Sequence, residues 1–247
     1  MYRSRITKRI SVNRPVAWEA IKLGREEHAF VVGMTGMGKT ELVRHLLEDP
    51  DKLRSVVYDA KHSRNINDWT DSGHVIIEQF EDLDECEGQG IRRIIYRPSF
   101  EESNNPEMQD AFFNWVFQRG YTRVFLDECN ALLAKTKPCM GLLKCLSMGR
   151  ENGISVICAS QRSHQIPVIV YSEASKIYAF HQNFEEDRRR ISSMTGFTDH
   201  QLMDLRKFEF LFHDLSRRGR FNRRIKLDLK GIRPRQANHL RLVRSAA

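Results

Sequence analysis

The chain has 247 residues, of which 40% are hydrophobic, so it can bury the core of one α/β domain with or without a small appendage. No apolar run approaches the roughly 18 residues of a membrane span, and no apolar region follows the basic N-terminus as in a secretory signal. The five cysteines lack C-x-x-C spacing, which argues against a disulfide framework or a zinc site and favours a reducing compartment.

The charge of the chain is unevenly distributed. Residues 216–247 hold eleven lysines and arginines and one acid, Asp228, whereas the net charge of the whole chain is +8. This basic C-terminal segment therefore follows 215 residues of nearly balanced charge. Such a distribution favours contact with a polyanion, most often nucleic acid, although a solvated basic tail without a partner has the same composition.

Apolar runs and their boundaries predict alternating strands and helices in the first half of the chain. Residues 1–27 are expected to form a basic lead-in with a strand and one helical turn at most. Between residues 28 and 96 we expect strands at about 28–33, 54–59, 75–77 and 92–96, a helix at about 39–48, and an acidic, glycine-punctuated connection at 81–90.

The second half of the chain continues this alternation. Asn105 and Pro106 are typical of a helix start, and Gly120 of its end; the apolar face of this helix is expected to hold Met108, Phe112, Trp115 and Val116. We expect strands at about 122–128, 154–159, 176–180 and 208–212, and helices at about 138–150 and 184–194. Residues 221–229 could pair with the last of these strands as an antiparallel C-terminal hairpin. The pattern predicts an α/β fold with a mostly parallel central sheet and helices on both faces.

Residues 30–47 have the pattern of a strand, a glycine-rich loop and a helix, and G-x-x-x-x-G-K-[ST] falls on Gly33, Gly38, Lys39 and Thr40. Glycines allow such a loop to turn its N–H groups onto an anion, and the helix start adds unpaired amides and a positive dipole. A plain glycine-rich turn is the alternative, but the strand and helix context favours a phosphate site. We expect Lys39 to reach the β- and γ-phosphates of ATP and Thr40 to ligate Mg²⁺. The nucleotide-binding residues are expected to be Gly33, Met34, Thr35, Gly36, Met37, Gly38, Lys39, Thr40 and Glu41.

A later apolar strand ends in two adjacent acids, Asp127 and Glu128. In P-loop NTPases the first acid holds Mg²⁺, and a glutamate beside it can orient and deprotonate the attacking water. Strands also end in acids simply for solubility, so this pattern gains its meaning from the phosphate loop. Gln161, at the end of another strand, could bond the attacking water or the γ-phosphate, or merely cap the strand.

Several segments together resemble the HerA/FtsK superfamily of DNA-translocating ATPases. They are residues 33–40, Val57-Tyr58-Asp59-Ala60-Lys61, Phe125-Leu126-Asp127-Glu128, and the block from Met148 to Arg162 with Gln165-Ile166-Pro167. The resemblance covers about residues 28–215 and implies a RecA-like fold of the additional-strand, catalytic-glutamate class. It also implies a ring, usually a hexamer, in which Arg150 acts as an arginine finger and Gln161 as a sensor. A guanidinium supplied in trans would stabilise charge on the γ-phosphate; alternatively, Arg150 is only a cation at a helix C-terminus.

The length of the chain narrows the resemblance to one group within this superfamily. A bare motor of this length resembles the genome-packaging ATPases of tailless, membrane-containing viruses, which implies pumping of double-stranded DNA into a preformed capsid. The expected organisation is a lead-in at 1–27, an ATPase core at 28–215 and a basic segment at 216–247. Partners would include other copies of the chain and capsid or portal-vertex proteins, in the host cytoplasm or at a virion vertex. The alternatives are a plasmid or cellular DNA translocase and a nucleotide-dependent assembly protein that does not hydrolyse ATP.

Overall fold

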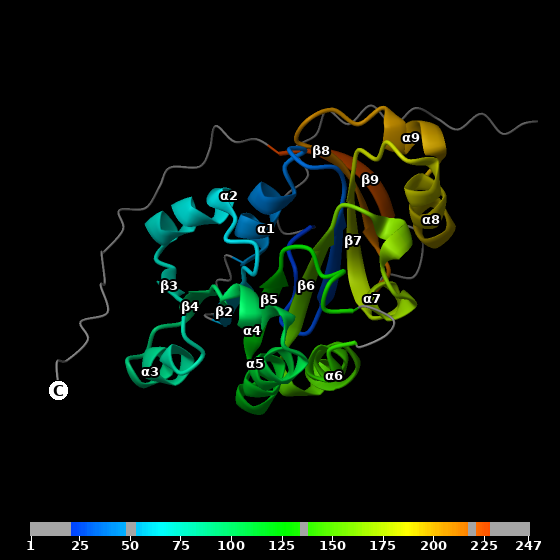
Figure 1. Ribbon diagram of the computed structural model, residues 1–247. Coiled ribbons are helices and arrows are strands. Elements are labelled where there is room, and N and C mark those ends of the chain that lie inside the picture. The colour runs from blue at the N-terminus through cyan, green and yellow to red at the C-terminus, as the bar shows by residue number, and fades with distance from the viewer. Residues whose placement is uncertain (1–20, 48–52, 134–137, 217–220, 228–247) are drawn as a thin grey trace, which may run out of the picture.

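The computed structural model describes residues 21–47, 53–133, 138–216 and 221–227 (Figure 1). The strands of these residues are β1 (His28–Val32), β2 (Arg54–Tyr58), β3 (Val75–Ile77), β4 (Arg93–Tyr96), β5 (Thr122–Leu126), β6 (Ser155–Ser160), β7 (Ala174–Phe180), β8 (Glu209–Asp214) and β9 (Phe221–Lys226). The α-helices are α1 (Lys39–Leu47), α2 (Arg64–Asn67), α3 (Asp82–Gly88), α4 (Phe100–Asn104), α5 (Pro106–Arg119), α6 (Met140–Met148), α7 (Val168–Ser172), α8 (Glu185–Thr195) and α9 (Asp199–Met203). Short 3₁₀ helices are η2 (Asp68–Ser72), η3 (Gly149–Asn152) and η4 (Ser163–Gln165).

Within the described residues the strands form one sheet in the order β3-β4-β2-β5-β6-β1-β7-β8-β9. The pairs from β3 to β7 are parallel, and β1 lies between β6 and β7. β8 runs antiparallel to β7, and β9 runs antiparallel to β8. The predicted mostly parallel sheet and its antiparallel C-terminal hairpin are both confirmed. The basic segment therefore contributes β9 to the sheet.

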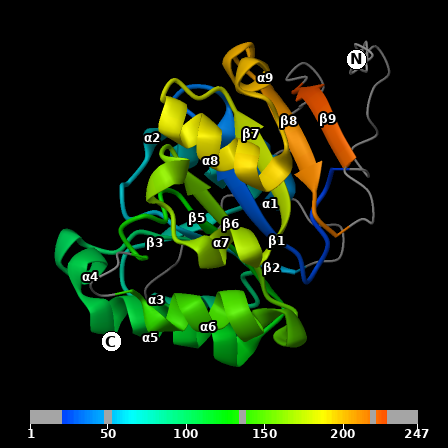
Figure 2. The same cartoon turned by 90° about the vertical axis from the view of Figure 1, so that its right-hand side faces the viewer.

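Alternate residues of the strands build a core on each face of the sheet. Phe30 and Val32 of β1 belong to the cluster that α3, α5, α6, α7, α8 and α9 cover. Ala29 and Val31 belong to the opposite cluster, which α1, α2 and η2 cover. In Figure 2, α6, α7 and α8 lie in front of the strands. Because helices cover both faces, the central strands can be buried throughout and mostly apolar, as the five buried residues of β1 show.

The predicted helix after Asn105 has the expected start and end. The Asn105 side chain accepts a hydrogen bond from the amide of Glu107, Pro106 occupies the first turn, and Gly120 is the C-cap. Its apolar face packs against α6, where a Cβ on Gly141 would lie 2.8 Å from Cβ of Phe113. The close approach of α5 and α6 forms the lower layer in Figure 1.

Residues 81–90 were predicted to be a connection, and this was wrong, because residues 82–88 form α3. Leu83 and Cys86 are the buried side chains of this helix, and they lie one turn apart on one face. The negative charges of the acids in its first turn interact favourably with the positive end of the helix dipole. Two apolar residues in an acidic stretch were too sparse a pattern for us to recognise a helix.

The end of the expected lead-in packs onto the sheet. Ile21 and Leu23 are buried in the cluster beneath α1. Arg123 on β5 donates to the carbonyls of Leu23 and Gly24 at 3.1 and 2.9 Å, and the Tyr178 hydroxyl donates to the Ile21 carbonyl. Residues 1–20 lie outside the described residues. In the described part of the chain, no helix combines the length and the apolar character needed to cross a membrane.

Candidate nucleotide-binding and hydrolysis site

The glycine-rich loop joins β1 to α1 at the carboxyl edge of the parallel strands, and its neighbours define its path. Gly33 has φ +155°, and a Cβ there would lie 2.4 Å from Cβ of Phe180 on β7. Gly38 has φ +109°, and a Cβ there would lie 2.6 Å from the ring of Phe208. The amide of Phe208 also donates to the carbonyl of Met37 at 2.9 Å. Close packing and backbone angle therefore both require glycine at positions 33 and 38.

The interior of this loop presents hydrogen-bond donors. In the described part of the chain, the backbone amides of residues 35–38 donate to no protein acceptor. They lead directly into the first turn of α1, which begins at Lys39. The ammonium group of Lys39 lies across the loop and donates to the carbonyls of Gly33 and Met34 at 2.7 and 3.1 Å. Exposed amides, a helix start and a lysine together suit a phosphate chain.

Asp127 and Glu128 follow β5 and lie at the same edge of the sheet as Lys39. Burial lowers the pKa of the Lys39 amine, the negative charges of Asp127 and Glu128 raise it, and the positive charge of Lys61 lowers it further. Charges affect one another in this way only over short separations. The two acids and the two lysines therefore share one site.

The Glu128 carboxylate is held in a defined orientation. Its backbone has φ +73°, in the left-handed region, which turns the side chain away from the direction of β5. The Ser160 hydroxyl donates to Oε1 at 2.9 Å, and the amide of Gln161 donates to Oε2 at 3.3 Å. Lys61 Nζ lies 3.7 Å from Oε2. A carboxylate held by two hydrogen-bond donors and a nearby ammonium group at the edge of a phosphate loop is suited to act on a water molecule there.

Asp127 and Thr40 fit the protein ligands of a magnesium ion. The Ser63 hydroxyl donates to Oδ2 of Asp127 at 3.0 Å, which leaves Oδ1 for the water shell of a cation. In the described residues, no three His, Cys, Asp or Glu side chains gather as a metal site. Mg²⁺ commonly takes one or two protein oxygens and completes its shell with phosphate oxygens and water. The Thr40 hydroxyl, the Asp127 carboxylate and a bound nucleotide would therefore suffice to bind the ion.

Gln161 lies beside Glu128, since its backbone amide donates to that carboxylate, and its side chain is exposed. The next residue anchors the loop to α8: Arg162 Nε donates to the fully buried carboxylate of Asp187 at 2.7 Å. Asp187 also accepts the amide of His164 at 2.9 Å. The sequence pattern did not reveal the role of Asp187, because an acid inside a charged helix has the appearance of a solvated residue.

Sequence reasoning also missed the contacts of Lys61 and Ser63 with the paired acids. Lys61 was noticed as part of the segment 57–61 but received no role, and Ser63 carried no signal at all. Their partners directly follow β5, more than sixty residues later, and only the pairing of β2 with β5 brings them together.

Arg150 is the one predicted site residue that the structure leaves apart from the others. It lies in η3, before β6 begins, whereas Gln161 follows the end of β6. Six residues of strand separate these ends by about 20 Å. Arg150 donates to the carbonyl of Glu173 and lies 3.8 Å from its carboxylate, and its Nε has no acceptor among the described residues. Within one chain, Arg150 cannot reach the phosphate loop.

A mostly parallel sheet with this strand–loop–helix unit and paired acids on a nearby strand defines the class as the P-loop NTPase fold. Among solved structures, the chain is similar to the genome packaging NTPase B204 from Sulfolobus turreted icosahedral virus 2 in complex with ATP-gammaS. The TM-score is 0.67 at 18% identity, over 84% of this chain and 100% of that chain. In complex with AMPPCP, the same protein gives a TM-score of 0.63 at 17% identity, over 84% and 100% of the two chains.

A bacterial protein shares the fold as well. VirB4 of Thermoanaerobacter pseudethanolicus gives a TM-score of 0.59 at 12% identity, over 81% of this chain and 89% of that chain. No protein-family profile and no curated protein sequence matches the chain. These neighbours confirm the predicted α/β P-loop fold, which is the fold that the resemblance implied.

Proposed function

We propose that this protein is an ATP-hydrolysing motor that translocates double-stranded DNA. The observation that carries the proposal is that the phosphate loop and the paired acids meet at the end of β6: the Ser160 carbonyl accepts the amide of Gly33 at 3.2 Å, and its hydroxyl donates to Glu128 at 2.9 Å. Solved neighbours with this fold are a genome-packaging NTPase, crystallised with ATP-gammaS and AMPPCP, and VirB4. Both the site chemistry and the fold support this function.

The proposed hydrolysis divides the work among the residues of the site. The loop amides and Lys39 bind the β- and γ-phosphates, and Thr40 and Asp127 hold the Mg²⁺ ion. When bound, Mg²⁺ neutralises charge on the phosphate oxygens. Glu128 accepts the proton of the attacking water, and its two hydrogen-bond donors and Lys61 hold the carboxylate in place. Gln161 lies close enough to Glu128 to bond the same water or the γ-phosphate.

The position of Arg150 supports a ring in which neighbouring subunits complete each other's sites. Its side chain, which is 42% exposed, lies at the end of β6 opposite the phosphate loop of its own chain. An arginine finger supplied by a neighbour typically raises turnover about 10³-fold or more. A hexameric ring threaded by DNA would bring one subunit's Arg150 edge against the next subunit's nucleotide.

Packaging into a capsid is the proposed setting for this motor. The chain covers the whole of the viral packaging NTPase, but only 59% of the conjugation coupling protein TcpA of pCW3, at a TM-score of 0.52. The higher TM-score of the viral packaging NTPase, 0.67, favours the viral setting over a plasmid or cellular translocase. Capsid or vertex proteins would then be its partners, and the host cytoplasm or the virion vertex its location.

The proposal is tested by ATP hydrolysis measured with and without double-stranded DNA. We expect DNA to stimulate hydrolysis, Lys39→Ala to lose nucleotide affinity, and Glu128→Gln to keep binding but lose 10²-fold or more in turnover. Lys144→Ala on α6 is the matched control, because Lys144 lies over the Phe117 ring and away from the site. ATP binding without hydrolysis, in the presence of DNA, would instead favour a nucleotide-dependent assembly protein.

A further inference from the structure

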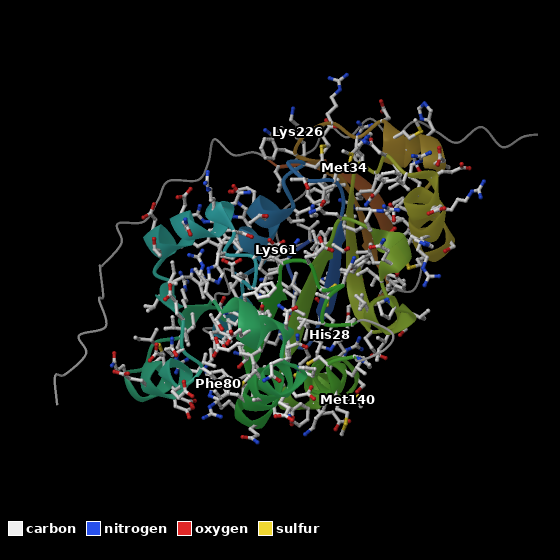
Figure 3. The ribbon with its side chains drawn as sticks, in the orientation of Figure 1. His28, Met34, Lys61, Phe80, Met140 and Lys226 are labelled. Carbon is white, nitrogen blue, oxygen red and sulfur yellow. The ribbon has the colours of Figure 1, made fainter. Side chains whose placement is uncertain are left out.

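One short loop contacts both of the paired acids. Residues 59–63 connect β2 to α2. Ser63 donates its hydroxyl to Asp127 at 3.0 Å, and Lys61 places its ammonium 3.7 Å from Glu128. Lys61 and Met34 of the phosphate loop both lie above His28 and Met140 in Figure 3, at the carboxyl end of the strands. Two residues of one loop thus hold two adjacent carboxylates that have separate tasks.

The loop itself is braced from beneath by Asp59, whose side chain is fully buried. Its carboxylate accepts the amide of Ser63 at 2.9 and 3.1 Å and Nε of Arg97 at 2.9 Å. Arg97 also donates to Oδ1 of Asn67 at 2.6 Å, which ties the loop to the end of α2. A buried carboxylate satisfied by a guanidinium and by a loop amide holds the backbone in one arrangement.

The backbone of the loop supports the same conclusion. His62 has φ +50°, a left-handed conformation that is uncommon for a residue with a side chain. Its Nε2 lies 3.0 Å from the carbonyl of Pro98, so the segment after β4 helps to maintain this conformation. The turn at His62 lets Lys61 and Ser63, which flank it, contact neighbouring carboxylates at the same time.

We propose that the loop 59–63 is the positioning element of the hydrolytic site, with Lys61 orienting Glu128 and Ser63 orienting Asp127. This inference rests on the proposed ATP hydrolysis and assigns to these residues a role that acts through the two acids. The Lys61 ammonium attracts Oε2, while Ser160 holds Oε1, so the carboxylate cannot rotate freely. Ser63 fixes Oδ2 of Asp127 and thereby directs Oδ1 to the metal shell.

A positioning role predicts a loss in turnover with little change in nucleotide binding. Misplacing a catalytic group by about 1 Å can cost 10²-fold in rate, so we expect Lys61→Ala and Ser63→Ala each to lower kcat about tenfold or more. Lys61→Arg and Ser63→Thr keep the cation and the hydroxyl and should restore much of this activity. The dissociation constant for a non-hydrolysable ATP analogue, measured on the full chain, should stay within about threefold of wild type.

A double variant separates positioning from a general loss of structure. If Lys61 acts through Glu128, then Lys61→Ala combined with Glu128→Gln should be no slower than Glu128→Gln alone. Lys144→Ala should behave as wild type in every assay. Full activity of Lys61→Ala and Ser63→Ala would overturn the inference, and so would analogue binding weakened as much as turnover, since Lys61 would then contact the phosphates. Failure of the wild-type chain to hydrolyse ATP would instead refute the proposed function itself.

Discussion

The Cβ of Phe180 lies 2.4 Å from the place where a Cβ on Gly33 would stand. β7 is therefore packed directly against the start of the phosphate loop, and the contact involves atoms that no rotamer change can move. The loop is part of the packing between β1 and β7 rather than an appendage of the sheet. Any side chain at position 33 must separate these two strands.

Gly33→Ala is therefore expected to destabilise the protein and to weaken nucleotide binding, because the added methyl group displaces β7 or the loop. Gly90→Ala, after α3 and away from the phosphate loop, is the matched control: Gly90 also has a positive φ, +72°, but a Cβ there meets no atom within 4 Å. Backbone strain alone costs about 1 kcal/mol, so the control should lose far less. Thermal unfolding and the affinity for an ATP analogue measure both effects. Equal losses in the two variants would mean that the packing against Phe180 is unimportant.

Arg150→Ala should bind ATP normally and hydrolyse it poorly, because Arg150 lies far from its own phosphate loop and would complete a neighbour's site. Mixing these subunits with Lys39→Ala subunits should restore part of the activity, since some interfaces then join an intact loop to an intact arginine. Turnover of the mixture is the measurement, with the mixed assembly verified by its size in solution. An inactive mixture that still assembles would limit Arg150 to its contact with Glu173 in the same chain.

The basic segment should contribute to DNA binding through arginines other than Arg224. Arg224 donates to Asp204 and Glu209 at 2.6 Å each, so its charge is used to attach β9 to β8 and α9. Arg217, Arg218 and Arg220 lie outside the described residues. Replacing these three should reduce the slope of log affinity against log salt by up to about 3, whereas Arg224→Ala should change it little. An unchanged slope in the triple variant would exclude them from the contact with phosphates.

The stability of the protein should fall as the pH decreases from about 6.5 to about 4. Burial, strengthened by the charge of Arg150, lowers the pKa of His28 to about 4, and burial with the charge of Arg93 lowers the pKa of His74 to about 4. The unfolded chain binds these protons near pH 6.5 and the folded chain only near pH 4. At pH 4.5 this difference removes about 2–3 kcal/mol of stability for each histidine.

Urea unfolding at several pH values tests this expectation. His28→Gln can still accept the amide of Val156 and donate to the carbonyl of Leu146, as His28 does, but it cannot bind a proton. Its stability should depend less on pH between 4.5 and 6.5 than that of the wild type. His164→Gln, at a largely exposed position, is the control and should keep the wild-type dependence. An identical dependence in His28→Gln would assign the effect to other groups.

Much of the fold follows from local patterns in the sequence. Strands such as β1 and β6 are short, mostly apolar runs, and α5 has a cap, a proline and a glycine in the order that a helix requires. Their alternation implied a parallel sheet, because parallel strands need helical crossovers. The phosphate loop was also recognisable, since its glycines, lysine and threonine lie within eight consecutive residues. Weakly patterned elements such as α3 were missed, because the burial of their few apolar residues depends on the strands against which they pack.

The sequence by itself determined the chemistry of the site: a loop for phosphates, a hydroxyl and an acid for a cation, and a glutamate for water. Only the tertiary structure decided how these groups are held. Ser63 meets Asp127 and Lys61 meets Glu128 because β2 and β5 are neighbours in the sheet, although they are distant in the chain. Arg150 and Gln161 are close in sequence, yet they lie at opposite ends of β6. The order of the strands results from the packing of the whole core, and no local pattern in the sequence specifies it.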